Sequence, residues 1–263
     1  MASPFSHNPL DILLSKDMKR ITCLFLVILL GITFASYAQN HSYRYKYRMV
    51  RLDSSYDSKL DPKLVSYMER HKARLDKKMN EVIGHCDVTM NVQAPQSPLS
   101  DLLTELLLKD GPAAMKQEAC DLSILNFGGI RTNLQAGDVT VGDIFKISPF
   151  DNYLVIVTVK GGELKKAVSR FRLDALMAAS AGLNVSYKNN VPYRIMIQGK
   201  ELQDDAMYRL ITLNFIAEGG DNILTGIKYE NTDYSMLIFR DFLIDEVKKI
   251  TKSGKSVSDA LTK

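Results

Sequence analysis

Apolar runs alternate along the chain with amphipathic stretches, and this pattern predicts short strands interspersed with helices. The run Leu154–Val159 is strongly β-branched, which is typical of a buried strand. The predicted strands span residues 41–52, 122–127, 154–159, 183–188, 193–198 and 208–213. The predicted helices span residues 62–82, 100–109, a short piece ending near 120, 164–171 and 235–251. The sequence therefore predicts one compact domain of mixed α/β (α+β) class, with mixed sheets and flanking helices.

Cap and turn residues place the ends of two helices. Asp61-Pro62 is typical of an N-cap followed by the first helical residue, because proline has no amide hydrogen to lose there. Gly84 is expected to end this helix. Ser97 or Ser100 is the candidate cap of the next helix, which Gly111-Pro112 is expected to stop.

The helix 62–82 carries apolar residues at helical spacing and Lys and Arg on its other face. We expect it to be solvated on the basic face and packed along the apolar stripe. His71 lies on this stripe and has no partner at metal-ligand spacing, which favours a core or edge histidine over a metal ligand.

The N-terminal segment resembles an export signal. Met18-Lys19-Arg20 gives a short basic start, residues 21–38 are almost wholly apolar, and Ser36-Tyr37-Ala38 provides small residues at a cleavage site. We predict cleavage after Ala38, with Met18 as the candidate true start and no stable membrane insertion afterwards. An uncleaved anchor is the alternative, because 18 apolar residues approach the length needed to span a bilayer.

The predicted organisation has four parts. Residues 1–38 form the signal peptide, 39–84 a lead-in strand and helix, 85–252 the α/β domain, and 253–263 a polar tail that we expect to be loose.

Charge and cysteine content narrow the classes of function. The net charge of +4 is small and the basic residues are scattered, which disfavours nucleic-acid binding. The alternation in Tyr43–Arg48 is explained more simply by an amphipathic strand than by an RNA contact. Cys86 and Cys120 remain after cleavage. The sequence allows either a disulfide between them or two buried free thiols. Two isolated cysteines do not make a metal site.

Three short segments place special residues on turns that follow or lie inside strand-like runs. They are residues 126–131 (NFGGIR), 148–152 (SPFDN) and 214–221 (NFIAEGGD). Together they offer a guanidinium, two phenyl rings, an amide and a carboxylate, which are the groups needed to bind phosphate, base and ribose. Taken singly, each has an ordinary structural explanation: a tight turn, a surface arginine, a core phenylalanine or a capping acid.

The order of these motifs resembles the C-terminal domain of the 5'-nucleotidase / UDP-sugar hydrolase family. That domain carries G-G-x-R, G-D-[IV]-T, P-F-x-N and N-F/Y-x-A-x-G-G-D. Here they occur in the same order, beginning at Gly128, Gly137, Pro149 and Asn214. The similarity covers roughly residues 80–250 and implies that fold for the domain.

The resemblance implies a substrate-binding site, residue by residue. The arginine reaches the phosphate, the two phenyl rings stack on opposite faces of the base, the asparagine addresses the base, and the aspartate binds ribose hydroxyls. The implied residues are Gly128, Gly129, Arg131, Phe150, Asn152, Phe215, Gly220 and Asp221. Because every base has a π-face, base preference is expected to be modest.

Two departures from the family pattern limit the implied activity. Residues 91–96 lack the further arginines that bacterial members often carry there, so the grip on phosphate is expected to be weaker or arranged differently. The family's catalytic centre uses two metals bound by D-x-H and G-N-H-[ED] motifs in a separate N-terminal domain, and these motifs are absent. We therefore expect no catalytic residues and no metal or other cofactor in this chain.

The sequence leaves two main hypotheses for function. The first is an exported, periplasmic or secreted substrate-binding half of a 5'-nucleotidase-type hydrolase in nucleotide catabolism. It would work with a separately encoded metallophosphoesterase that carries divalent metals. The second is a stand-alone nucleotide- or nucleoside-binding protein without catalysis. A structural remnant that binds nothing is a third class.

Overall fold

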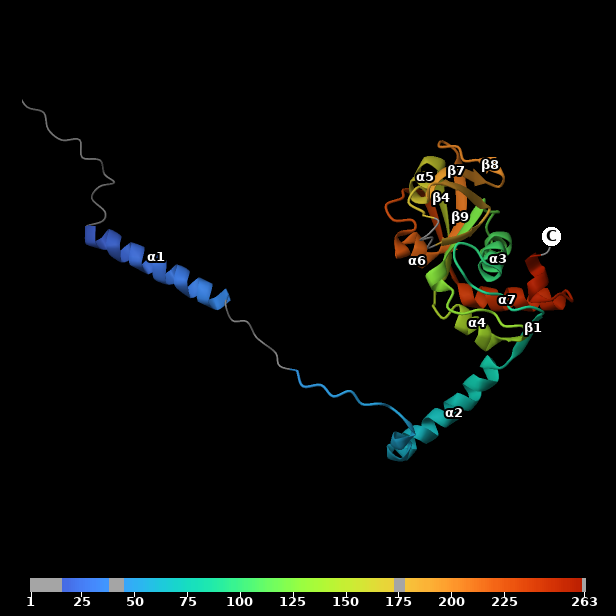
Figure 1. Cartoon of the computed structure of the whole chain (residues 1–263), viewed down its shortest axis with the longest axis horizontal. Helices are drawn as coiled ribbons and strands as arrows, with labels where there is room; N and C mark the ends of the chain where they lie inside the picture. Colours follow the sequence, from blue (N-terminus) through green and yellow to red (C-terminus); the bar gives the residue numbers. More distant parts are fainter. Residues whose placement is uncertain (1–15, 38–44, 173–177, 262–263) are drawn as a thin grey trace, which may run out of the picture. The chain divides into compact units, whose positions relative to one another are not determined.

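The computed structural model describes residues 16–37, 45–172 and 178–261, and the chain divides into two compact units, residues 1–60 and 61–263 (Figure 1). The first unit contains helix α1 (Lys16–Tyr37) and a 3-10 helix η1 (Ser54–Lys59). Within the described residues, none of the helices combines the length and apolar content that crossing a bilayer requires. The predicted cleavage site at Ala38 lies outside the described residues.

The predicted strand over residues 41–52 is wrong where the structure describes it. Residues 45–53 have no regular secondary structure and their side chains are exposed, while residues 41–44 lie outside the described part. Alternating side chains specify a strand only when a neighbouring strand pairs with its backbone and one face is buried.

The second unit begins with α2 (Pro62–Met79), whose N-cap is Asp61 as predicted. Its carboxylate accepts a hydrogen bond from the Lys63 amide at 2.8 Å. The helix ends at Met79, earlier than predicted, and strand β1 (Val82–Cys86) follows directly.

The expected packing of the α2 stripe is wrong except at its end. Leu64, Met68 and Leu75 are all more than half exposed, whereas Met79 packs against the domain core. His71 is exposed and lies against the ring of Tyr67, with 4.4 Å between ring centroids, so it is not a core histidine.

Three sheets form the framework of the second unit. The main sheet has the order β10-β4-β9-β2-β5, a second sheet pairs β1 with β3, and a third has the order β6-β7-β8. Strands of the main sheet are β2 (Leu122–Asn126), β4 (Tyr153–Lys160), β5 (Ala178–Ala181), β9 (Met207–Leu213) and β10 (Tyr229–Ile238). The other strands are β3 (Gly137–Thr140), β6 (Leu183–Lys188), β7 (Val191–Ile197) and β8 (Lys200–Glu201).

Helices cover the main sheet, which confirms the mixed α/β class (Figure 1). They are α3 (Pro98–Ala114), α4 (Val141–Ile147), α5 (Gly161–Val168), α6 (Asn214–Ala217) and α7 (Phe239–Lys252). Short 3-10 turns are η2 (Phe127–Gly129), η4 (Gly220–Asn222) and η5 (Val257–Leu261).

The central strands of the main sheet are buried on both faces. In β4, Leu154 and Ile156 belong to a core shared with α3, α4 and α7, whereas Val155 and Val157 belong to a second core shared with α5 and α6. The alternation of side chains across a strand explains why consecutive apolar residues are needed here.

Close helix–sheet packing explains why α3 continues through Gly111-Pro112, where the sequence predicted a stop. A Cβ atom on Gly111 would lie 2.6 Å from Ile211 Cδ1, so the glycine permits close approach rather than ending the helix. Ser97 is the cap, and its side chain and that of Ser100 form a capping box. Residues 115–120 do not form the predicted short helix.

The C-terminal elements also differ from the prediction. Residues 235–238, predicted as helix, belong to β10, where Ile238 pairs with Tyr153 of β4. The predicted loose tail is wrong up to residue 261, because Val257 is completely buried and the Ser256 hydroxyl donates to the His85 carbonyl at 3.2 Å.

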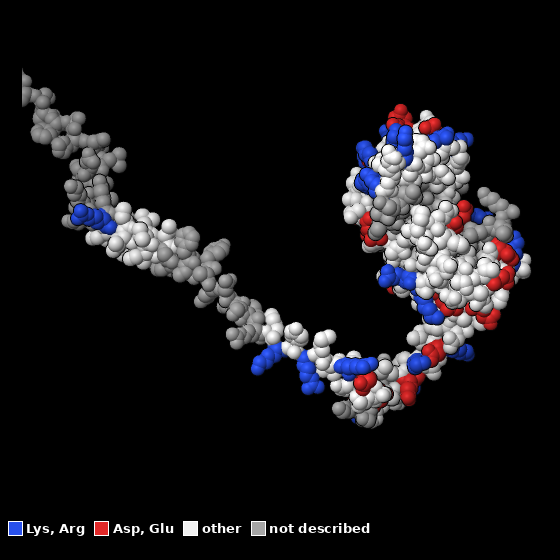
Figure 2. Space-filling view, viewed as in Figure 1, with Lys and Arg blue, Asp and Glu red and all other residues white. Residues whose placement is uncertain are grey.

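Lysine and arginine residues alternate with acidic residues over the visible face of unit 61–263, without a continuous basic stripe on that face (Figure 2). This distribution agrees with the small net charge of +4.

Replacing Val257 by alanine should show that the C-terminal segment stabilises the domain. The Val257→Ala variant should lower the free energy of unfolding by about 1.5–3 kcal/mol, from lost apolar burial plus the cavity left behind. Denaturant unfolding measures this, with Val191→Ala as control because Val191 is 47% exposed. Equal stability of the two variants would contradict the packing of the tail.

Candidate functional site

The three motif segments meet at one end of the main sheet because of the strand directions. Strands β2 and β9 run parallel, with Leu122 opposite Leu210, and β4 runs antiparallel to β9, with Leu154 opposite Leu213. The carboxyl ends of β2 and β9 and the amino end of β4 therefore lie together. The turns that follow β2 and β9 and precede β4 are the three motif segments, 126–131, 148–152 and 214–221.

These turns enclose a pocket of about 270 Å³. Its lining is Asn126, Gly128, Gly129, Arg131, Phe150, Asn152, Phe215 and Asp221. Seven of the eight residues predicted from the sequence are in this lining, and Gly220 is the exception.

The two phenylalanines leave much of their rings open to solvent although they lie on ordered turns. Phe150 is 45% exposed and Phe215 is 41% exposed, and both line the same pocket. Phe215 lies on the short helix α6, directly after β9. Pairing of β9 with β4 ends at Leu213, and the Asn214 side chain then accepts a hydrogen bond from the Tyr153 amide at 2.9 Å. This bond ties together the two segments that carry the rings.

The backbone of Gly220 lies against the Phe215 ring. A Cβ atom at this position would lie 2.4 Å from Phe215 Cε1, so only glycine lets the ring lie over the backbone here. The adjoining Gly219 and Asp221 have φ values of 98° and 52°, in the left-handed region. This turn directs the Asp221 carboxylate back into the pocket.

Asn126 is a pocket residue that the sequence reasoning missed. It is buried at the end of β2, and its Nδ2 atom donates to Asp221 Oδ2 at 2.7 Å. Its Oδ1 atom has no hydrogen-bond partner among the described residues, although it is buried. A buried acceptor without a partner costs free energy, so this oxygen is an energetically unfavourable feature of the free protein. The signal in the sequence is a strand that ends in a polar amide directly before Phe-Gly-Gly.

Arg131 provides the positive charge of the pocket. Its backbone amide donates to the Ile147 carbonyl at 2.9 Å, and its Nη1 atom donates to the Gly128 carbonyl at 3.0 Å. The side chain is exposed and pairs with no carboxylate in the described residues, so most of its five donors remain available for an anion.

The described residues contain no group of three or more His, Cys, Asp or Glu side chains suited to a metal ion. The ring nitrogens of His85 lie 3.5 Å from Asp87 Oδ1 and 3.5 Å from Asp138 Oδ1. Cys86 and Cys120 are free thiols rather than a disulfide. Burial raises the pKa of Cys86, and it raises the pKa of Cys120 to about 11, so both thiols stay protonated near neutral pH.

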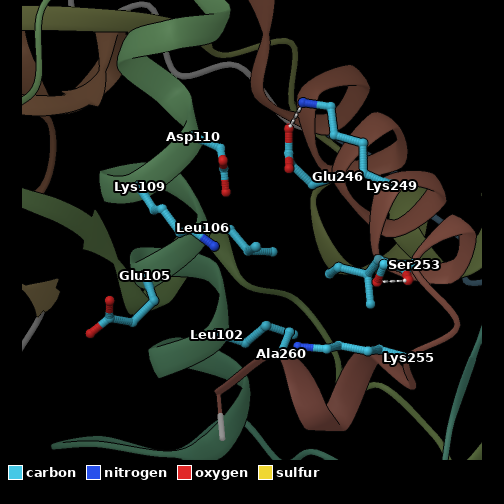
Figure 3. A pocket seen from close by; sticks show the side chains of 11 residues that line it. Leu102, Glu105, Leu106, Lys109, Asp110, Glu246, Lys249, Ser253, Lys255 and Ala260 are labelled. Atoms are coloured by element: carbon cyan, nitrogen blue, oxygen red, sulfur yellow. Dashed lines mark hydrogen bonds and ion pairs between the residues drawn. The ribbon is translucent and has the colours of Figure 1, made fainter. Parts of the chain in front are cut away.

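A larger cavity of about 540 Å³ lies between α3 and α7, away from the motif turns (Figure 3). Charged side chains from both helices surround it, and the nearly buried Glu246 is paired with Lys249. Burial raises the pKa of Glu246. The cavity is lined by none of the predicted site residues, whereas the smaller pocket is lined by seven of them, so the smaller pocket is the candidate ligand site.

Comparison with known proteins places this fold in a family. The family described as "5'-nucleotidase, C-terminal domain" matches residues 82–228. Protein UshA of Yersinia enterocolitica is 33% identical over 179 residues, which cover 65% of this chain and 31% of that protein. A 5'-nucleotidase of Vibrio cholerae is 32% identical over 139 residues, which cover 50% of this chain and 25% of the relative.

Solved structures give the same result. The crystal structure of a 5'-nucleotidase precursor from Thermus thermophilus superimposes with a TM-score of 0.57 at 25% identity, covering 71% of this chain and 39% of that one. The chain thus matches between a quarter and two fifths of the length of these three proteins.

Replacing Gly220 by alanine should test whether the glycine supports the Phe215 ring. The added methyl group must displace the ring or the turn, which should lower the free energy of unfolding by about 1–3 kcal/mol. Gly162→Ala in helix α5 is the control, because its Cβ would meet nothing closer than 3.5 Å. Chemical unfolding and the NMR shifts of the Phe215 ring would report the two effects; unchanged values in both would contradict this role.

Proposed function

The chain belongs to the 5'-nucleotidase C-terminal domain family, and from this we propose that its pocket binds a nucleotide. The observation that carries the proposal is the meeting of two half-exposed phenyl rings, a guanidinium and a carboxylate around one pocket of about 270 Å³. Each group matches one part of a nucleotide, and the groups come from three segments that are distant in the sequence.

In the proposed complex, the base lies between the rings of Phe150 and Phe215. Stacking on aromatic rings depends little on the identity of the base, so base preference is modest. Asn152 addresses the polar edge of the base, and Asp221 accepts hydrogen bonds from ribose hydroxyls. Arg131 binds the phosphate, for which its fork of donors is suited.

Asn126 prepares Asp221 for this role. Its amide donates to Oδ2 of the aspartate, which leaves Oδ1 and the remaining lone pairs of the carboxylate for ribose. Gly128 keeps the space beside the carboxylate open, since a Cβ atom there would lie 3.5 Å from Asp221 Oδ2.

We place the hydrolytic step on a separately encoded metallophosphoesterase. The proposal is supported by the sequence, which carries the substrate-binding motifs of the family but neither D-x-H nor G-N-H-[ED]. Export of the chain, supported by the apolar leader before Ala38, would bring both halves to extracellular or periplasmic nucleotides.

Binding without catalysis is the second candidate function. It is supported by the pocket, whose lining supplies both phenyl rings, the guanidinium and the carboxylate from this chain. A protein of this kind would capture a nucleotide or nucleoside.

Removing either ring should weaken nucleotide binding. Phe150→Ala and Phe215→Ala should each cost about 1–3 kcal/mol of AMP affinity, or about 5- to 150-fold in Kd. Isothermal titration calorimetry with AMP, adenosine and UDP-glucose measures this. Tyr193→Ala provides a matched control, because Tyr193 is an aromatic residue of β7 that is 67% exposed and outside the pocket. Unchanged affinity in both phenylalanine variants would reject the stacked base.

Mixing this chain with a candidate metallophosphoesterase should separate the two functions. We expect phosphate release from AMP to rise on mixing, relative to the sum of the separate chains, and to fall again with Phe215→Ala. Absence of any gain, together with measurable AMP binding, would favour binding without catalysis.

A further inference from the structure

Arg240, the second residue of α7, is a buried arginine directly behind the pocket. It is 8% exposed, although a charged side chain is rarely buried without partners. Its position in the first turn of a helix is also electrostatically unfavourable for a cation, because the helix dipole is positive there. The position of this residue in the helix therefore disfavours an arginine, so the reason for the arginine must lie in its tertiary contacts.

The guanidinium contacts three successive residues of the Phe150 turn. Nη1 donates to the carbonyls of Pro149 and Phe150, at 3.2 and 3.4 Å, and Nη2 donates to Asp151 Oδ1 at 2.6 Å. The carboxylate of Asp151 is 69% exposed, so this ion pair is screened by water and contributes little by itself. The two carbonyl contacts are therefore the specific part of the interaction.

The other face of the guanidinium is also occupied. Its Cζ atom lies 4.1 Å from the centroid of the Phe145 ring, which belongs to α4. Arg240 thus joins α4, the turn that follows α4 and the start of α7. A planar fork of donors that stacks on a ring can make all of these contacts, whereas a lysine ammonium cannot.

The first turn of α7 holds the next pocket residue through its backbone. The Phe239 amide donates to the Asn152 carbonyl at 2.8 Å. Residues 149–152 are therefore fixed from one side by two adjacent residues of α7. The Phe150 ring, which is 45% exposed, is not fixed by burial of its own and depends on this backbone for its position.

We propose that Arg240 is a positioning residue of the pocket. It fixes the turn at residues 149–152 so that the Phe150 ring and the Asn152 amide face the ligand, and it does not touch the ligand itself. The effect on affinity rests on the proposed nucleotide-binding function, whereas the effect on the turn does not.

The experiment places a single fluorinated phenylalanine at position 150 and records its 19F resonance in the free protein. Arg240→Gln and Arg240→Lys should each shift or broaden this resonance relative to the parent, because the turn loses its anchor. Asp151→Asn removes only the charge of the exposed partner and should give a smaller change of the same kind. It also keeps the test open should Arg240→Gln fail to fold.

Arg209→Gln is the matched control. Arg209 is another partly buried arginine with a backbone carbonyl contact, from Nη2 to Glu118 at 3.3 Å, but it lies at the opposite end of β9 from the pocket. This variant should leave the fluorine resonance unchanged. An unchanged resonance in folded Arg240→Gln and Arg240→Lys would overturn the proposal.

Calorimetric titration with AMP then reports the consequence for binding. The two Arg240 variants should bind AMP roughly tenfold more weakly or worse. The reason is that a displaced Phe150 ring no longer stacks fully on the base. If the parent protein binds no AMP, the proposed function fails, while the fluorine spectrum still decides the role of Arg240. Parent-like AMP affinity combined with a shifted resonance would overturn the part of the proposal that concerns the ligand.

Discussion

Strand direction in the main sheet is the constraint on which the candidate site depends. The parallel pairing of β2 with β9, and the antiparallel pairing of β9 with β4, bring three strand ends to one edge. Reversal of any one of these strands would send its turn to the far end of the sheet. The apolar residues of β4 and β9 alternate between two separate cores, which buries both faces of these strands and holds them in the centre of the sheet.

Polar side-chain contacts connect the three motif turns to the main sheet and to α7. Asn214 joins the two ring-bearing segments, Asn126 joins β2 to Asp221, and Arg240 joins the Phe150 turn to α7. The rings themselves are too exposed to be held by burial, so their positions depend on the backbone beneath them. The exposed rings therefore offer apolar surface to a ligand, while the strands and helices that position them stay buried.

Glycines in the site serve different physical purposes. Gly219 provides a left-handed backbone conformation, whereas Gly220 provides space beneath the Phe215 ring. Gly129 allows the Asn126 side chain to approach the chain, since a Cβ atom there would lie 2.7 Å from Asn126 Oδ1. Each of these glycines therefore shapes the pocket without contributing a functional group.

Local pattern alone determined the parts of this protein whose signals lie within a few residues. The buried strand β4 and the cap at Asp61 follow from apolar runs and cap chemistry. Seven of the eight residues that the resemblance to the family implied line the pocket. Tertiary structure decided the rest: the continuation of α3 past Gly111, the burial of Val257, and the contacts of Asn126 and Arg240. These depend on contacts between residues that are distant in the chain, and such contacts exist only once strand pairing has fixed which segments meet.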